Sequence, residues 1–208
     1  MPTEQTAFTE ATRPKLTFWF EFASTYSYLS AMRIETMARE ANVEIIWRPF
    51  LLGPIFKAQG WDTSPFNLMP AKGRYMWQDM ARQCEQLGLP LVQPAPFPQH
   101  SLLAARIGHA GRAQPWIAEY SRAVFHAEFG EGSDISDPAL LASLLLEAGA
   151  DAKAVMEDAA SPENKTGLRQ AVEEATELGI FGAPSFTTES GELYWGNDRL
   201  ADALAAAR

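Results

Sequence analysis

Residues 15–38 read KLTFWFEFASTYSYLSAMRIETMA, and they predict a buried strand that runs directly into a helix. Residues 15–22 are rich in strand-favouring side chains and are short enough for a strand inside a core. Apolar residues then recur with helical spacing from Tyr26 onward. Small and hydroxyl-bearing residues separate the two patterns, so Ser24 or Thr25 is placed to cap the helix.

The remaining pattern alternates strands with a long helical block. A second strand is predicted at residues 43–50, which completes a strand–helix–strand unit. Residues 51–70 carry five glycines and prolines and predict a long loop. Helical patterns dominate residues 71–178. Two short strands at 184–188 and 192–195, joined by a turn, and a helix at 197–207 close the chain.

This order predicts an α/β protein with a thioredoxin-like fold, interrupted by a large all-helical insertion. We assign residues 15–53 and 165–208 to the thioredoxin-like domain and residues 54–164 to the helical insertion domain. Residues 1–14 are polar and are expected to form a flexible tail.

Composition and charge exclude several classes of partner. With 208 residues, 47% of them hydrophobic, the chain can bury a large core. Its 17 basic and 26 acidic residues give a net charge of -9, and the basic residues are scattered, which argues against nucleic acid and anionic membranes. The chain starts without a signal-peptide pattern and has no apolar run of about 18 residues. We therefore expect a soluble, cytoplasmic protein.

The cysteine and histidine content argues against disulfide redox activity and against a metal site. Cys84 is the only cysteine, so the chain cannot form an internal disulfide, a Cys-x-x-Cys pair or a multi-cysteine zinc site. Cys84 lies in a helical pattern and is expected to pack. His100, His109 and His126 lack metal-ligand spacing, so no metal is expected. His100 precedes a predicted helix and faces either a cleft or the surface.

Ser24 and Ser27 stand where a thioredoxin-fold oxidoreductase carries its cysteine pair. Free N–H groups at a helix start favour an anion by about 0.3–1 kcal/mol each. A serine hydroxyl that donates to sulfur also favours the thiolate over the thiol. This pattern therefore suits a ligand thiolate, such as that of glutathione. The alternative is that the serines only cap the helix.

Pro184 begins the third predicted strand, directly after Gly182 and Ala183. A proline at the first residue of a strand needs no special function. In thioredoxin-like folds, however, the corresponding proline is cis and lies beside the functional helix start. We therefore expect a cis Ala183–Pro184 bond, although such bonds are uncommon in general.

Two further groups of polar residues are candidates for binding a charged ligand. Asn197 and Asp198 either cap the last helix or bind a carboxylate and an ammonium group, both of which glutathione carries at its γ-glutamyl end. Lys57, Lys72 and Arg74 are candidate partners for another carboxylate. Solvation of the lysines is the simpler alternative.

Several segments together resemble the 2-hydroxychromene-2-carboxylate isomerases and their relatives, the kappa-class glutathione transferases of the DsbA-like superfamily. The resemblance extends from Lys15 to Ala207, and it depends on the set of segments rather than on any one of them. These segments are 22–29 (FASTYSYL), 48–53 (RPFLLG), 70–76 (PAKGRYM), 134–137 (DISD), 182–184 (GAP) and 195–200 (WGNDRL).

The resemblance implies a glutathione-dependent homodimeric enzyme. In such an enzyme the catalytic Ser24 hydroxyl faces the sulfur, while Lys72, Ala183, Asn197 and Asp198 contact the rest of glutathione. The reaction it implies interconverts 2-hydroxychromene-2-carboxylate and trans-o-hydroxybenzylidenepyruvate in naphthalene degradation. The implied substrate is therefore a small aromatic carboxylate, and glutathione is a recycled cofactor.

Two departures from the family pattern affect this interpretation. Thr25 stands where the family has a proline after its serine, and it adds a competing hydroxyl. The family's loop asparagine has no clear counterpart, because Trp61 follows Gly60 and Asn67 is offset. Substrate identity is what these differences leave open. A kappa-like transferase with another electrophile and a non-catalytic thioredoxin-like binding module are the alternatives.

The aromatic residues near these segments suggest a wall for an aromatic substrate. The candidates are Phe22, Tyr26, Trp61 and Trp77. Packing in the core is the alternative for each of them.

Overall fold

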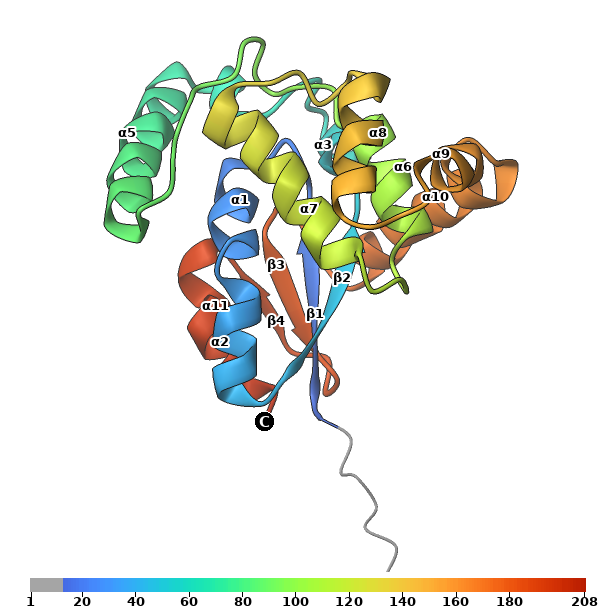
Figure 1. Ribbon diagram of the computed structural model, residues 1–208. Helices are drawn as coiled ribbons and strands as arrows, with labels where there is room; N and C mark the ends of the chain where they lie inside the picture. The colour runs from blue at the N-terminus through green and yellow to red at the C-terminus, as the bar shows by residue number, and fades with distance from the viewer. Residues whose placement is uncertain (1–12) are drawn as a thin grey trace, which may run out of the picture.

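The computed structural model describes residues 13–208 and shows a four-stranded sheet surrounded by helices (Figure 1). The strands are β1 (Lys15–Phe20), β2 (Glu44–Pro49), β3 (Ser185–Thr188) and β4 (Leu193–Trp195), in the order β2-β1-β3-β4. β1 and β2 are parallel, whereas β3 is antiparallel to both β1 and β4. This is the predicted thioredoxin-like sheet, in which a long helical segment separates β2 from β3.

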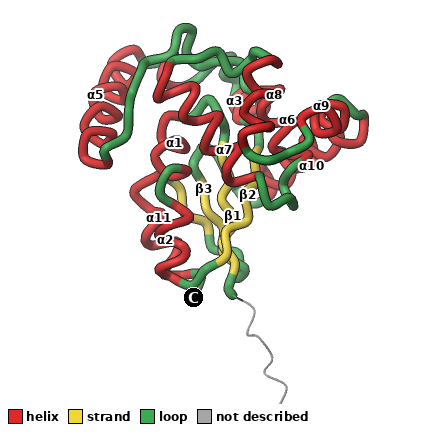
Figure 2. The backbone as a smooth tube through the Cα atoms, in the orientation of Figure 1, coloured by secondary structure: helices red, strands yellow, loops and turns green. Residues whose placement is uncertain are grey.

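Helices make up most of the rest of the described chain, and many of them gather around the carboxyl end of β1 (Figures 1 and 2). They are α1 (Thr25–Ala31), α2 (Ile34–Ala41), α3 (Leu52–Ala58), α4 (Pro65–Leu68), α5 (Pro70–Leu87), α6 (Leu102–Ala110), α7 (Ile117–Phe125), the π-helix η1 (His126–Gly130), α8 (Pro138–Glu147), α9 (Ala152–Ala159), α10 (Pro162–Glu177), the 3-10 helix η2 (Asn197–Arg199) and α11 (Leu200–Ala206).

Alternate side chains of β1 fill the two faces of the sheet, as the period of a strand requires. Phe18 packs in the larger core, where its ring centroid lies 5.0 Å from that of Phe20 and 5.4 Å from that of Phe186. Trp19 points to the other face and packs edge-on against Phe50, beside residues of α3 and α10. Because both faces are covered, β1 is a buried central strand.

The structure corrects the sequence prediction at two places near the site. The predicted first helix is divided at Met32, and Arg33 turns its guanidinium back to the carbonyl oxygen of Leu29. The predicted loop at residues 51–70 contains α3 and α4. Pro54 and Pro65 are compatible with these helices because each lies in a first turn, where no helical N–H bond is lost.

The fold does not test two predictions about how the chain is divided into domains and a tail. The division into a thioredoxin-like domain and a helical insertion domain stays a prediction, although the helices do lie between β2 and β3. The predicted tail at residues 1–14 falls mostly outside the described residues. Within residues 13–208 no helix is both long and apolar enough to cross a bilayer.

Candidate functional site

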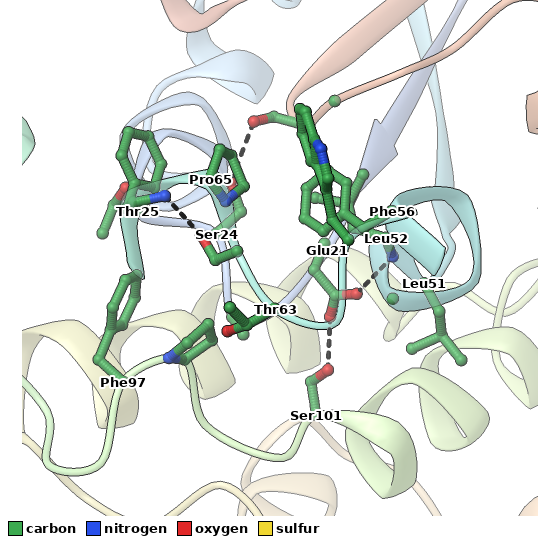
Figure 3. Close-up of a pocket in the computed structure, with 18 of the residues that line it drawn as sticks. Glu21, Ser24, Thr25, Leu51, Leu52, Phe56, Thr63, Pro65, Phe97 and Ser101 are labelled. Atoms are coloured by element: carbon green, nitrogen blue, oxygen red, sulfur yellow. Dashed lines mark hydrogen bonds between the residues drawn. The ribbon is translucent and has the colours of Figure 1, made fainter. Parts of the chain in front are cut away.

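A cavity of about 1010 Å³ opens where β1 ends and α1 begins (Figure 3). Its wall combines segments that are far apart in the sequence: Glu21, residues 23–26, parts of 51–66 and of the start of α5, residues 97–102 and 181–183, and Trp195. Small-molecule sites commonly measure about 300–1000 Å³. A peptide-sized ligand and a small second reactant can therefore share this cavity.

Ser24 lies at the cavity wall as the N-cap of α1. Its Oγ accepts a hydrogen bond from the backbone N–H of Ser27 at 3.3 Å and donates one to the carbonyl oxygen of Ala183 at 3.1 Å. Because α1 has only seven residues, its dipole is a smaller influence than these local N–H and O–H groups. The hydroxyl is thus half-buried, next to the cavity, and able to turn its proton toward a ligand.

The neighbouring hydroxyl groups are occupied or hidden. Thr25 is buried, and its Oγ1 donates to the Met76 sulfur at 3.3 Å. Ser27 is fully buried and does not line the cavity. The competing hydroxyl expected from Thr25 is therefore buried against Met76, whereas the half-buried Ser24 hydroxyl would have to exchange its hydrogen bond to Ala183 for one to a ligand.

The Ala183–Pro184 peptide bond is cis, which confirms the sequence prediction. Ala183 lies beside Ser24 in the cavity wall, and Pro184 leads into β3. Two segments separated by 159 residues thus meet at one hydrogen bond. The structure also contains cis bonds at Ala95–Pro96 and Phe97–Pro98, which the sequence analysis did not predict.

Lys72 reaches the cavity from the first turn of α5. Its Nζ lies 5.8 Å from the centre of the Phe66 ring, and no carboxylate pairs with it within residues 13–208. Lys57 and Arg74 do not line this cavity. Lys72 is therefore the predicted cation that the fold brings to the site.

Asn197 and Asp198 lie outside the cavity wall. The Asn197 side chain is buried and accepts hydrogen bonds from Ser30 at 3.0 Å and Arg33 at 2.8 Å, while its Nδ2 donates to Gln83 at 2.9 Å. In this arrangement Asn197 ties α1, α2 and α5 together. The predicted contact of Asn197 with glutathione therefore stays a prediction.

Asp198 differs from Asn197 in that its carboxylate is exposed. That carboxylate is paired with Arg199 at 3.1 Å. Its predicted contact with an ammonium group of glutathione also stays a prediction.

Aromatic side chains form much of the cavity wall, although they are only partly those expected. Tyr26 and Trp61 line it, whereas Phe22 belongs to the core and Trp77 packs beside it. Sequence analysis missed six aromatic wall residues, namely Phe56, Phe66, Tyr75, Phe97, Phe181 and Trp195. Phe181 and Trp195 pack with ring centroids 4.7 Å apart and ring planes tilted by 57°, and both are exposed at this wall.

Tyr26 carries a polar group at the cavity wall. Its hydroxyl donates to Asp79 at 2.9 Å. Burial, and then the Asp79 carboxylate, raise the pKa of Tyr26 above its ordinary value. Tyr26 therefore keeps its proton at neutral pH and contributes a neutral phenol to the wall.

Glu21 is a titratable residue of the cavity that the sequence analysis did not single out. It is 6% exposed; one carboxyl oxygen accepts from the Ser101 hydroxyl and the other from the Leu52 N–H at 3.0 Å (Figure 3). Burial raises its pKa, although these hydrogen bonds oppose that effect. A charged residue between Phe20 and Phe22, at the end of a buried strand, was the available signal.

Metal chemistry finds no support in the described part of the chain. Residues 13–208 contain no cluster of three His, Cys, Asp or Glu side chains that could hold a metal ion. Cys84 is buried, and burial raises the pKa of its thiol. His100 lines the cavity and is exposed, so it lies both at the cleft and at the surface.

Comparison with known proteins agrees with this geometry. A family described as the DSBA-like thioredoxin domain matches residues 15–207. The chain is 31% identical to a 2-hydroxychromene-2-carboxylate isomerase from Sphingobium xenophagum, over 88% of this chain and 92% of that protein. It is 26% identical to human glutathione S-transferase kappa 1, over 88% of this chain and 85% of that protein.

A solved structure of a 2-hydroxychromene-2-carboxylate isomerase superimposes with a TM-score of 0.80 at 29% identity, covering 92% of this chain and 93% of the other. The match therefore includes both the sheet and the helices that build the cavity. Together with the sequence identity, it establishes the family. The chain belongs to the DsbA-like thioredoxin-domain family and, within it, to the 2-hydroxychromene-2-carboxylate isomerases.

Proposed function

We propose that this protein is a glutathione-dependent isomerase that interconverts 2-hydroxychromene-2-carboxylate and trans-o-hydroxybenzylidenepyruvate, a reaction of aromatic hydrocarbon breakdown. The observation that carries the proposal is the Ser24 hydroxyl, placed against Ala183 at the wall of a large apolar cavity. Relatives named for this isomerase activity, at 29–31% identity over most of their length, support the choice of reaction.

The residues at the cavity suit the parts of glutathione. The Ser24 hydroxyl would donate to the sulfur, and the backbone of Ala183 would meet the peptide. Lys72 has no carboxylate partner in the described chain, so it suits a carboxylate of glutathione or of the substrate. We further propose that Asn197 and Asp198 bind the γ-glutamyl end, which requires their present hydrogen bonds to rearrange.

Glutathione, when bound, would supply a thiolate nucleophile for the conjugated double bond of the substrate. The contribution of the chain is to keep the sulfur charged and to hold the substrate in an apolar space. Ser24 favours the charged sulfur because its hydrogen bond is stronger to an anion than to a thiol. The aromatic wall and the neutral phenol of Tyr26 exclude water and suit a flat aromatic ring.

A kappa-like glutathione transferase is the second candidate, favoured by the similarity to human glutathione S-transferase kappa 1. Both candidates need the same thiolate site. They differ in whether glutathione leaves free or attached to the product, which mass spectrometry of the reaction mixture distinguishes.

We also propose that the protein acts as a cytoplasmic homodimer. Leu68 at the end of α4, Met69 between the helices and Tyr75 on α5 are 42%, 46% and 59% exposed and lie near the site, where a second copy would cover them. Light scattering tests the dimer: a monomer mass at micromolar protein would contradict it.

Calorimetric titration with glutathione tests the proposal against a non-catalytic binding module. Saturable binding that weakens in Lys72→Ala is expected, because a carboxylate of glutathione loses the ammonium group that pairs with it. Absence of binding at millimolar glutathione would overturn the proposed function.

A further inference from the structure

Glu128 is a second buried carboxyl group, and it does not line the cavity. It lies in the π-helix η1, is 0% exposed, and neither of its carboxyl oxygens has a hydrogen-bond partner within residues 13–208. A π-helical turn is uncommon and often marks a functional site. An ionised carboxylate without partners is very costly in a protein interior, so Glu128 holds a proton.

Glu21 differs from Glu128 in its access to the cavity and in its hydrogen bonds. It lines the cavity, and each of its oxygens already accepts a hydrogen bond, from Ser101 and from the Leu52 N–H. These donors stabilise a negative charge on Glu21. Burial raises the pKa of Glu128 well above its ordinary value, and the charge of Glu21 adds to that shift. Of the two groups, Glu21 therefore ionises first.

We propose that Glu21 is the catalytic base of the cavity and that Glu128 holds the one proton of this buried carboxyl pair. This inference rests on the proposed function and concerns the opening of the substrate ring. The Glu21 carboxylate accepts the proton of the hydroxyl on C2 as the bond between C2 and the ring oxygen breaks. The electron pair of that bond goes to the phenolic oxygen, which then takes the proton back from Glu21.

The chemistry needs no other reactant, because the proton that leaves one oxygen of the substrate returns to the other. Both oxygens are attached to C2, so one carboxyl group is able to serve both. Glu128 acts through Glu21 as a positioning residue: its neutral form leaves Glu21 as the single negative charge of the pair. Ionisation of both would place two like charges in one buried region.

Other titratable groups also face this cavity and must be distinguished from Glu21. They are Tyr26 from α1, Asp62 and His100 from the loops, and Lys72 and Tyr75 from α5. No ion pair joins Glu21 or Glu128 to a cation among the described residues. If one of these other groups were the base, the pH dependence of ring opening would survive the loss of Glu21.

Exchange NMR tests the base without glutathione, by following conversion between cyclic 2-hydroxychromene-2-carboxylate and its open cis form. Wild-type protein is expected to accelerate ring opening, less so as pH falls and Glu21 takes up a proton. Glu21→Gln should lower this rate by about 100-fold or more and remove the pH dependence, because general base catalysis contributes about that much. Glu21→Asp, which keeps a carboxylate, should recover part of the rate.

Infrared spectroscopy of the protein alone locates the proton. A carbonyl band of a protonated carboxylic acid is expected at neutral pH and should disappear in Glu128→Gln. Its disappearance in Glu21→Gln instead, or an unchanged ring-opening rate in that variant, would overturn the proposal. A protein that opens the ring but shows no glutathione-dependent isomerisation would overturn the proposed function and leave Glu21 as the base.

Discussion

Replacing Ser24 by alanine removes the hydroxyl that the proposed mechanism uses and leaves the rest of the cavity wall in place. In the free protein this hydroxyl donates to Ala183 at 3.1 Å, a neutral hydrogen bond worth about 1 kcal/mol. A hydrogen bond to a charged sulfur is worth about 1.5–3 kcal/mol. The exchange of one for the other favours the bound thiolate by about 0.5–2 kcal/mol, and we expect turnover to fall by about 10-fold.

Two measurements separate this effect from damage to the fold. The ultraviolet absorbance of the thiolate, followed against pH, should show a higher pKa for glutathione bound to Ser24→Ala than for glutathione bound to the wild type. Loss of the N-cap hydrogen bond, which is long at 3.3 Å, should cost about 0.5–1 kcal/mol in the free energy of unfolding. The variant should therefore remain folded.

Ser27→Ala is the matched control, since Ser27 has the same side chain on the same helix but is buried and outside the cavity. It should retain most of the activity. Equal turnover and equal thiol pKa in the wild type and in Ser24→Ala would refute the role given to Ser24.

Three further predictions concern stability, each measured by urea unfolding. Asn197→Ala should lower the free energy of unfolding by about 1–3 kcal/mol, because buried Ser30 and half-buried Arg33 and Gln83 lose their hydrogen bonds to it; an unchanged stability would contradict that role. Glu128→Met should raise it by about 1–3 kcal/mol, because it removes a buried carboxyl group without partners, and a clear loss would contradict this. Burial, together with the charges of nearby arginines, lowers the pKa of His109 from 6.5 to about 4. The free energy of unfolding should therefore fall as the pH drops from about 6.5 to about 4, because the unfolded chain takes up the proton first. His109→Gln should lose much less stability over the same pH range.

Local signals in the sequence predicted the parts of the site that neighbouring residues determine. A strand, a serine and a helix in succession placed Ser24 at an N-cap, which depends on backbone geometry that a short segment sets for itself. The cis Ala183–Pro184 bond was expected instead from the position of this proline in thioredoxin-like folds. Reasoning from local signals missed α3 because it counted Gly53 and Pro54 as breakers, although both are tolerated in a first turn.

Contacts between distant segments could not be predicted in this way. Asn197 binds partners on three helices, and nothing near it in the sequence indicates that Gln83 lies within 2.9 Å. Glu21 is partly predictable. A charged residue inside an apolar run is visible in the sequence, but only the fold brings Leu52 and Ser101 within hydrogen-bond distance of it. Leu52, Gln83 and Ser101 all belong to the mainly helical segment between β2 and β3, so their hydrogen bonds depend on how that segment folds.

The most direct test of the central claim is the number of product molecules formed for each glutathione. The protein is incubated with 2-hydroxychromene-2-carboxylate in large excess over glutathione, and mass spectrometry follows both the open trans product and total free glutathione. A glutathione-dependent isomerase gives many turnovers per glutathione while free glutathione stays constant. Consumption of one glutathione for each product molecule, or turnover that does not depend on glutathione, would contradict the proposed function.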